Sequence, residues 1–270
     1  MSKGVILFAY NSEAYNYYEM AEFAAKRVNH FLDLPVTIVT NTESMPRHTD
    51  YTWDNIVYND PDKDNIREWG QWINKGRYQA FEVSPYDETI LLDADYVVNS
   101  NKLLDVFKCY DDFACHDNTN LLMYPKFPND KLSHISYDLL WATVVGFKKS
   151  KRSEQIFQCL EMVQKNYEHY SNIHGFVHHS YRNDFALSLA LRIANGHTIL
   201  DRDFLPWNLN HIGRNTTVYK NNDDEFNTEY TILFDNWQKS KIRKEWLAIK
   251  DFDFHMINKD NFVEIINECH

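Results

Sequence analysis

The chain has 270 residues, of which 44% are hydrophobic and 25% are charged, and its net charge at pH 7 is −11. This length and composition are typical of a soluble globular protein with one large domain or two small ones. The negative net charge disfavours non-specific binding to nucleic acid or to an anionic membrane surface.

The first hundred residues alternate between strand-like and helix-like patterns. Apolar runs predict strands over residues 5–9, 36–40, 56–58 and 90–92. Apolar positions at helical spacing predict a helix over 14–32, capped by Asn11 or Ser12, and a second helix over 66–83, which Pro85 ends. The alternation predicts an α/β fold with a mostly parallel central sheet, whose functional site lies beyond the carboxyl ends of the strands.

The rest of the chain gives a weaker pattern. A strand is predicted over 139–147, and amphipathic helices are predicted over 153–167 and 182–194. Beyond about residue 200, strands over 198–200 and 230–234 and a helix over 240–249 fit the pattern best. Because no repeat, low-complexity tract or linker divides the chain, we expect one domain with a decorated C-terminal third.

Cysteine and glycine spacings exclude several common sites. The four cysteines show no Cys-x-x-Cys spacing, which predicts free thiols rather than a disulfide framework or a zinc site. No two of the seven glycines are one residue apart, so a Gly-x-Gly dinucleotide fingerprint is absent. No signal peptide and no apolar segment of roughly 18 residues is present, and we therefore expect a cytoplasmic protein.

The most informative segment follows the predicted strand at 90–92, where Asp93 and Asp95 stand between apolar residues. Side chains two apart on an extended strand point to the same side. Two carboxylates there would repel each other and lose hydration, and a divalent cation such as Mg²⁺ or Mn²⁺ removes that conflict. The pair predicts a metal site that takes up substrate phosphates. The alternative is an acidic turn that only ends the strand.

Several short blocks of the sequence resemble a known family. They are a basic residue and a turn before the acidic pair, the start of a helix, and a segment near the C-terminus: Arg77 with Tyr86-Asp87, Arg182-Asn183-Asp184, and Phe254-His255-Met256-Ile257-Asn258-Lys259. The chain is similar to metal-dependent glycosyltransferases of the GT-A fold, of the glycogenin and lipopolysaccharide-galactosyltransferase type. The resemblance implies a nucleotide-diphospho-sugar transferase fold with one Rossmann-like domain over residues 1–270. It further implies a nucleotide-binding half over about 1–100 and an acceptor-binding half over about 101–270.

The resemblance also implies roles for individual residues. Mn²⁺ or Mg²⁺ would be bound by Asp93, Asp95 and His255. Arg77 would contact the donor sugar or its diphosphate, and Lys259 would contact the diphosphate. Asn183 and Asp184 would face the transferring sugar, and Asp184 would steady that sugar or accept the acceptor proton. Further donor contacts would come from the end of the first strand, from the residue between the two aspartates and from a later turn: Ala9, Tyr10, Asn11, Ala94 and Asn208.

The implied activity is transfer of a hexose or pentose from a nucleoside-diphosphate sugar, with a UDP-sugar as the favoured donor and retention as the favoured stereochemistry. The acceptor stays open among a glycan, a lipid, a protein and a hydroxylated DNA base, and so does the oligomeric state. Two features depart from the family: the Trp141-Ala142-Thr143 strand replaces Asn-Ser-Gly, and the spacing from His255 to Lys259 is short.

Two other hypotheses use the same acidic pair. The segment 90–97 also resembles the first motif of haloacid-dehalogenase-type phosphatases, with Asp93 as the nucleophile and Asp95 as the acid. Those proteins usually carry this motif on their first strand, whereas here a strand and a helix precede it. A module that binds metal and sugar without turnover is the third hypothesis.

Overall fold

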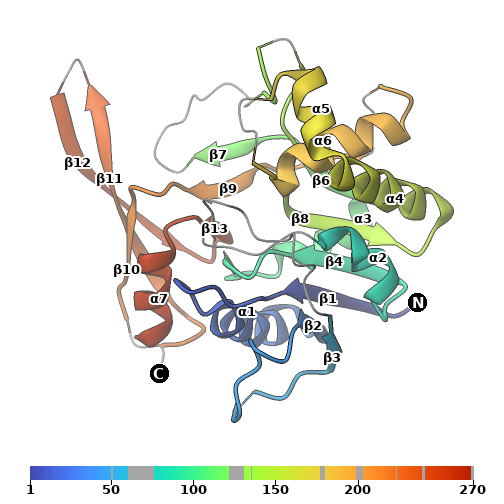
Figure 1. The fold of residues 1–270 in the computed structure, drawn as a ribbon. Coiled ribbons are helices and arrows are strands. Elements are labelled where there is room, and N and C mark those ends of the chain that lie inside the picture. The colour runs from blue at the N-terminus through green and yellow to red at the C-terminus, as the bar shows by residue number, and fades with distance from the viewer. Residues whose placement is uncertain are drawn as a thin grey trace.

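The computed structural model describes residues 1–49, 51–59, 76–121, 131–134, 136–176, 180–198, 203–222, 224–238 and 241–268. Within these ranges the largest sheet has six strands in the order β3-β2-β1-β4-β8-β6 (Figure 1). The strands are β1 Lys3–Phe8, β2 Val36–Thr40, β3 Asn55–Tyr58, β4 Glu88–Leu92, β6 Phe113–His116 and β8 Trp141–Lys148.

The pairing of these strands is mostly parallel. β1 pairs in parallel with β2 and β4, and β2 pairs in parallel with β3. Only β8 is reversed within this described sheet, being antiparallel to both β4 and β6. β1, β2 and β4 are almost wholly buried, as strands in a sheet covered on both faces must be. The predicted α/β fold with a mostly parallel central sheet is confirmed.

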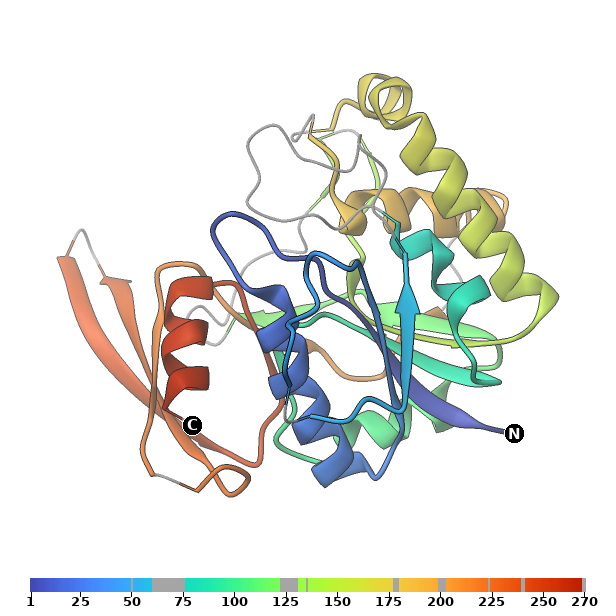
Figure 2. The ribbon, with the colours of Figure 1, turned by 60° about the horizontal axis from the view of Figure 1, so that its bottom comes forward.

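Helices cover both faces of this sheet (Figures 1 and 2). α1 Tyr17–Leu32 lies on one side, with α7 Lys259–Asn267 packed beside it through Phe23 and Phe262. α4 Lys151–Lys165, α5 Tyr167–His174 and α6 Asn183–Ala194 lie on the other side. None of the helices in the described part of the chain has the length and apolar character that spanning a membrane requires.

Two smaller sheets complete the described fold. One has the order β5-β13-β9-β7, from β5 Tyr96–Val97, β13 Phe254–Met256, β9 Leu209–Ile212 and β7 Thr119–Leu121. The other consists of β10 Thr217–Lys220, β11 Glu229–Gln238 and β12 Lys241–Lys250. The β11–β12 ribbon extends away from the body of the protein (Figure 1). The remaining short elements are η2 Arg77–Gln79, α2 Ala80–Val83, η3 Lys102–Asp105 and α3 Val106–Cys109.

Three predicted elements differ from the structure. The helix over 240–249 is wrong, because β12 pairs antiparallel with β11 along its whole length and leaves Trp246 64% exposed. The helix over 66–83 is only partly described: 66–75 lie outside the described residues, and the remainder forms two short elements, η2 and α2. For the strand over 198–200, residues 199 and 200 lie outside the described residues.

The cap of α1 also differs from the prediction. Asn16 is the N-cap, and its side chain accepts a hydrogen bond from the Glu19 N–H at 3.2 Å. Asn11 still serves this helix, because its Oδ1 accepts the Tyr18 N–H at 2.9 Å. Two side chains therefore satisfy first-turn donors that the helix itself leaves unpaired.

Candidate functional site

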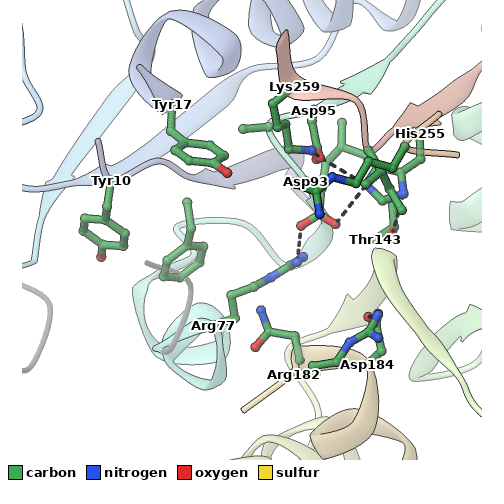
Figure 3. Close-up of a pocket in the computed structure, with 16 residues that line it drawn as sticks. Tyr10, Tyr17, Arg77, Asp93, Asp95, Thr143, Arg182, Asp184, His255 and Lys259 are labelled. Carbon is green, nitrogen blue, oxygen red and sulfur yellow. Dashed lines mark hydrogen bonds and ion pairs between the residues drawn. The ribbon is translucent and has the colours of Figure 1, made fainter. Parts of the chain in front are cut away.

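A cavity of about 460 Å³ lies at the carboxyl ends of β1 and β4. This is the edge of the sheet where the α/β pattern predicts a site. Its lining comes from segments far apart in the sequence: Tyr10 follows β1, Arg77 begins η2, Asp184 lies in the first turn of α6, and Lys259 begins α7 (Figure 3). The volume lies within the range of roughly 300–1,000 Å³ typical of ligand pockets.

The acidic pair reaches the cavity through a turn. β4 ends at Leu92, and the Tyr96 N–H donates to the Asp93 carbonyl at 3.1 Å. The Asp93 N–H in turn donates to the Thr143 carbonyl of β8 at 3.0 Å. Both aspartates line the same cavity. The predicted reason, alternation along a strand, is wrong, because a turn holds both residues.

Asp93, Asp95 and His255 form a group whose ligand atoms lie within 4.8 Å of one another. The Nε2 atom of His255 is 3.2 Å from Asp95 Oδ2 and 3.9 Å from Asp93 Oδ2. β13 brings the histidine there, because it pairs antiparallel with β5 and places His255 opposite Tyr96, the residue after Asp95. Burial lowers the pKa of His255 and favours the neutral imidazole, the form that ligates metal. Two carboxylates and one imidazole fit Mn²⁺ or Mg²⁺.

Two basic side chains of the chain contact the same carboxylates (Figure 3). Arg77 forms an ion pair with Asp93, and Lys259 forms one with Asp95. The Lys259 ammonium also donates to the Met256 carbonyl at 2.9 Å, and burial lowers its pKa to about 7. Arg77 is 5% exposed, and its buried Nη2 has no hydrogen-bond partner among the described residues. A buried donor without a partner is costly, so this atom points to a missing acceptor.

The start of α6 forms another wall of the cavity. Asp184 Oδ1 accepts the Ala142 N–H of β8 at 2.9 Å, and Asp184 Oδ2 lies 3.4 Å from Arg182 Nη2. Asn183 also lines the cavity, and its side-chain oxygen accepts the Tyr181 hydroxyl at 3.0 Å. Asp184 is thus oriented by a backbone donor and one arginine, and it faces the acidic pair across the cavity.

The structure brings most of the predicted site residues together. Nine of them line the cavity: Tyr10, Arg77, Asp93, Ala94, Asp95, Asn183, Asp184, His255 and Lys259. Three others are not among the lining residues. Ala9 is fully buried, Asn11 bonds to α1 and to the Ser44 carbonyl, and exposed Asn208 donates to Asn120 at 2.8 Å.

Several residues of the site were not assigned a role from the sequence. Tyr17, Arg182 and Arg214 line the cavity, and so does Thr143 of β8, the strand whose sequence differs from that of the family. Arg182 stands beside the predicted Asn183-Asp184 pair, so its position was the available signal. His211 lies behind His255, with the two Nδ1 atoms 3.1 Å apart. The position of His211 beside His255 depends on how β9 and β13 are aligned, and no short sequence motif predicts that alignment.

Comparison with known proteins gives solved structures only. No family model and no curated protein matches the sequence. The glycosyltransferase GlyE of Streptococcus pneumoniae TIGR4 is 14% identical over 76% of this chain, with a TM-score of 0.42. This chain spans less than half of that protein's length, at 45%.

Two structures of LgtC are also similar. An active-site mutant is 14% identical over 69% of each chain, with a TM-score of 0.47. The galactosyltransferase in complex with donor and acceptor sugar analogues is 15% identical over 70% of each chain, with a TM-score of 0.44.

Proposed function

We propose that this protein is a metal-dependent glycosyltransferase of the GT-A type, which transfers a sugar from a nucleoside-diphosphate donor to a hydroxyl acceptor. The observation that carries the proposal is the convergence of Asp93, Asp95 and His255 with Arg77 and Lys259 in one cavity. An acidic and imidazole set that fits a divalent ion, flanked by buried basic groups, is suited to a diphosphate.

The orphaned atom of Arg77 supports a polyanionic ligand. Its Nη1 is held by Asp93, while its buried Nη2 lacks an acceptor among the described residues. An unsatisfied buried donor costs about 1–3 kcal/mol. A phosphate or sugar oxygen of the donor satisfies it, and the guanidinium then joins the ligand to the Asp93 carboxylate.

The chemistry divides among the residues of the cavity. Mn²⁺ or Mg²⁺ on Asp93, Asp95 and His255 would supply positive charge against the departing diphosphate. Arg77 and Lys259 add to that stabilisation from the protein itself. Asp184 is held by the Ala142 N–H through Oδ1, and its Oδ2, beside Arg182, would act on the reacting sugar. It steadies the oxocarbenium-like sugar, with retention of configuration, or accepts the acceptor proton.

The donor and the acceptor are proposed as chemical classes, together with the region of the chain that binds each. Tyr10 and Tyr17 line the side of the cavity next to β1 and α1, where an aromatic ring can stack on a nucleobase, and we favour a UDP-hexose or UDP-pentose. The region from about 1–100 binds the nucleotide, and the region from about 101–270 binds the acceptor. The candidate acceptors are a glycan, a lipid, a protein hydroxyl and a hydroxylated DNA base. We propose that the protein acts in the cytoplasm.

A thermal-shift screen of nucleotide sugars with and without Mn²⁺ tests this function. We expect one nucleoside-diphosphate sugar to raise the melting temperature only with the metal, and Asp95→Asn to lose that shift while its circular dichroism is unchanged. We also expect slow metal-dependent hydrolysis of that donor and no hydrolysis of an aryl phosphate. Rapid phosphate release from the aryl ester would instead support the phosphatase hypothesis, with Asp93 as nucleophile.

A further inference from the structure

A second buried histidine, His211, lies directly behind the candidate metal ligand His255. β9 and β13 pair in parallel with His211 in register with His255, so the two side chains leave the sheet on the same face. Their Nδ1 atoms are 3.1 Å apart. Both residues are almost inaccessible to solvent, with 4% of His211 and 8% of His255 exposed. Trp141 packs on the His211 ring, with centroids 5.0 Å apart, and limits its movement.

The short nitrogen–nitrogen contact fixes how protons are shared. A hydrogen bond between two imidazole nitrogens needs one N–H and one lone pair. The other nitrogen of His255, Nε2, faces both aspartates, and a metal ligand must present a lone pair there. A neutral His255 that does so carries its proton on Nδ1, and that proton points at His211 Nδ1.

The contacts leave one rival for this role. Thr143 Oγ1 lies 3.5 Å from His255 Nδ1, at the outer limit of a hydrogen bond, whereas His211 Nδ1 is at an ordinary distance. Both residues belong to described strands, so the comparison between them is direct. The geometry favours the histidine as the acceptor.

We propose that His211 is a positioning residue of the metal centre: its Nδ1 lone pair accepts the His255 Nδ1–H and so fixes the tautomer that presents His255 Nε2 to the ion. The inference rests on the proposed function, because it takes Asp93, Asp95 and His255 as metal ligands. It adds a member of the site that acts through His255 and does not contact substrate.

Without an ion, an ionised Asp95 carboxylate can only accept a hydrogen bond from His255 Nε2–H, whose nitrogen is 3.2 Å from Asp95 Oδ2. That contact requires the opposite tautomer of His255, in which the proton between the two rings would be on His211 Nδ1. On binding an ion, His255 would release its Nε2 proton to water, the His211 Nδ1 proton would move to His255 Nδ1, and His211 would take one proton from water at Nε2. Both rings are neutral before and after, so the pair neither gains nor loses a proton.

Calorimetric titration with Mn²⁺ tests the proposal through binding alone. We expect His211→Leu to weaken Mn²⁺ binding by about 10- to 100-fold, the usual effect of removing a partner behind a metal ligand. His211→Asn should bind within roughly threefold of the wild type, because its amide oxygen can take the place of the Nδ1 acceptor. Equal losses in both variants, or none in His211→Leu, would overturn the proposal. A loss in Thr143→Val alone would assign the role to the threonine.

Nitrogen NMR of the histidine rings in the wild type gives a readout that packing alone does not move. With Mg²⁺, which is diamagnetic, we expect the proton on His255 Nδ1 and none on His211 Nδ1; a protonated His211 Nδ1 in the Mg²⁺ form would contradict the proposal.

The Asp95→Asn variant distinguishes a failure of the His211 role from a failure of the proposed metal centre. If Asp95→Asn abolishes Mn²⁺ binding and His211→Leu does not weaken it, only the role of His211 fails. If the wild type binds no divalent ion, the metal centre and the role of His211 fail together.

Discussion

The ammonium group of Lys259 is ion-paired with Asp95, one of the carboxylates that we assign to the metal. Both side chains are largely buried, with 10% of each exposed. The Lys259 ammonium neutralises the Asp95 carboxylate, so a divalent ion has to compete with this lysine for Asp95. The donor diphosphate gives the ammonium another anionic partner and thereby relieves the competition.

Lys259→Met removes this internal competitor. We expect Mn²⁺ binding in the absence of nucleotide to tighten by about tenfold, which corresponds to about 1.4 kcal/mol. Donor binding should weaken at the same time, because the diphosphate loses one positive partner. Titrating Mn²⁺ alone and then UDP in saturating Mn²⁺ measures both effects. Weaker Mn²⁺ binding in the variant would show that Lys259 supports the ion and does not compete with it.

Arg77→Lys tests whether the orphaned guanidinium nitrogen binds the donor. A lysine can pair with Asp93, but it lacks the second N–H group that a guanidinium holds in a fixed geometry for another hydrogen bond. We expect the donor KM to rise by roughly 10- to 100-fold, the loss of a charge-assisted hydrogen bond of about 1.5–3 kcal/mol. Arg243→Lys, at an exposed position of β12, is the matched control and should leave the KM unchanged. An unaltered KM in Arg77→Lys would place the donor elsewhere.

Asp184→Asn separates charge from shape at the start of α6. The amide oxygen of asparagine can still accept the Ala142 N–H, so the side chain keeps its orientation while its negative charge is lost. We expect kcat to fall by about 10²–10⁴-fold with a smaller change in donor affinity, as for a group that acts mainly in the transition state. Steady-state kinetics with the identified donor measures this difference. A rise in KM at constant kcat would instead assign Asp184 to ground-state binding.

The core of the fold was predictable because its strands are buried on both faces. The segments that become β1, β2 and β4 are rich in apolar residues without strict polar alternation, and they are buried, as strands of a sheet covered on both faces are. β12 was not predictable in the same way, because its structure comes from pairing with β11 and not from a buried face. Its apolar residues Trp246 and Leu247 are exposed, so a pattern of apolar spacing there gave the wrong element.

The candidate site was predictable only in part. Asp93 and Asp95 stand out locally, the resemblance placed Arg77, His255 and Lys259 with them, and all five residues line one cavity. Asn208 carried no physical signal beyond a short likeness, and it lies on the exposed side of the turn before β9. The contact between His211 and His255 depends on the register of two strands that are distant in the sequence. A single sequence does not state that register.

The acid stability of the protein should depend on His116. Its side chain is fully buried on β6, both ring nitrogens lack hydrogen-bond partners among the described residues, and burial lowers its pKa to about 3 from 6.5. The unfolded chain therefore binds a proton below pH 6.5 that the folded protein does not take up until about pH 3. Stability attributable to this group is complete above pH 6.5 and is lost as the pH falls, by about 1.4 kcal/mol per pH unit.

His116→Leu removes the titrating group and fills its place with an apolar side chain. We expect the free energy of unfolding of the variant to fall less steeply than that of the wild type between pH 6.5 and 4.5, with a difference of roughly 3 kcal/mol accumulated over that range. At pH 7 the variant should be at least as stable, because two unsatisfied buried nitrogens are gone. Urea denaturation of both proteins at several pH values measures this. Parallel stability profiles would mean that His116 is protonated or hydrogen-bonded in the folded protein.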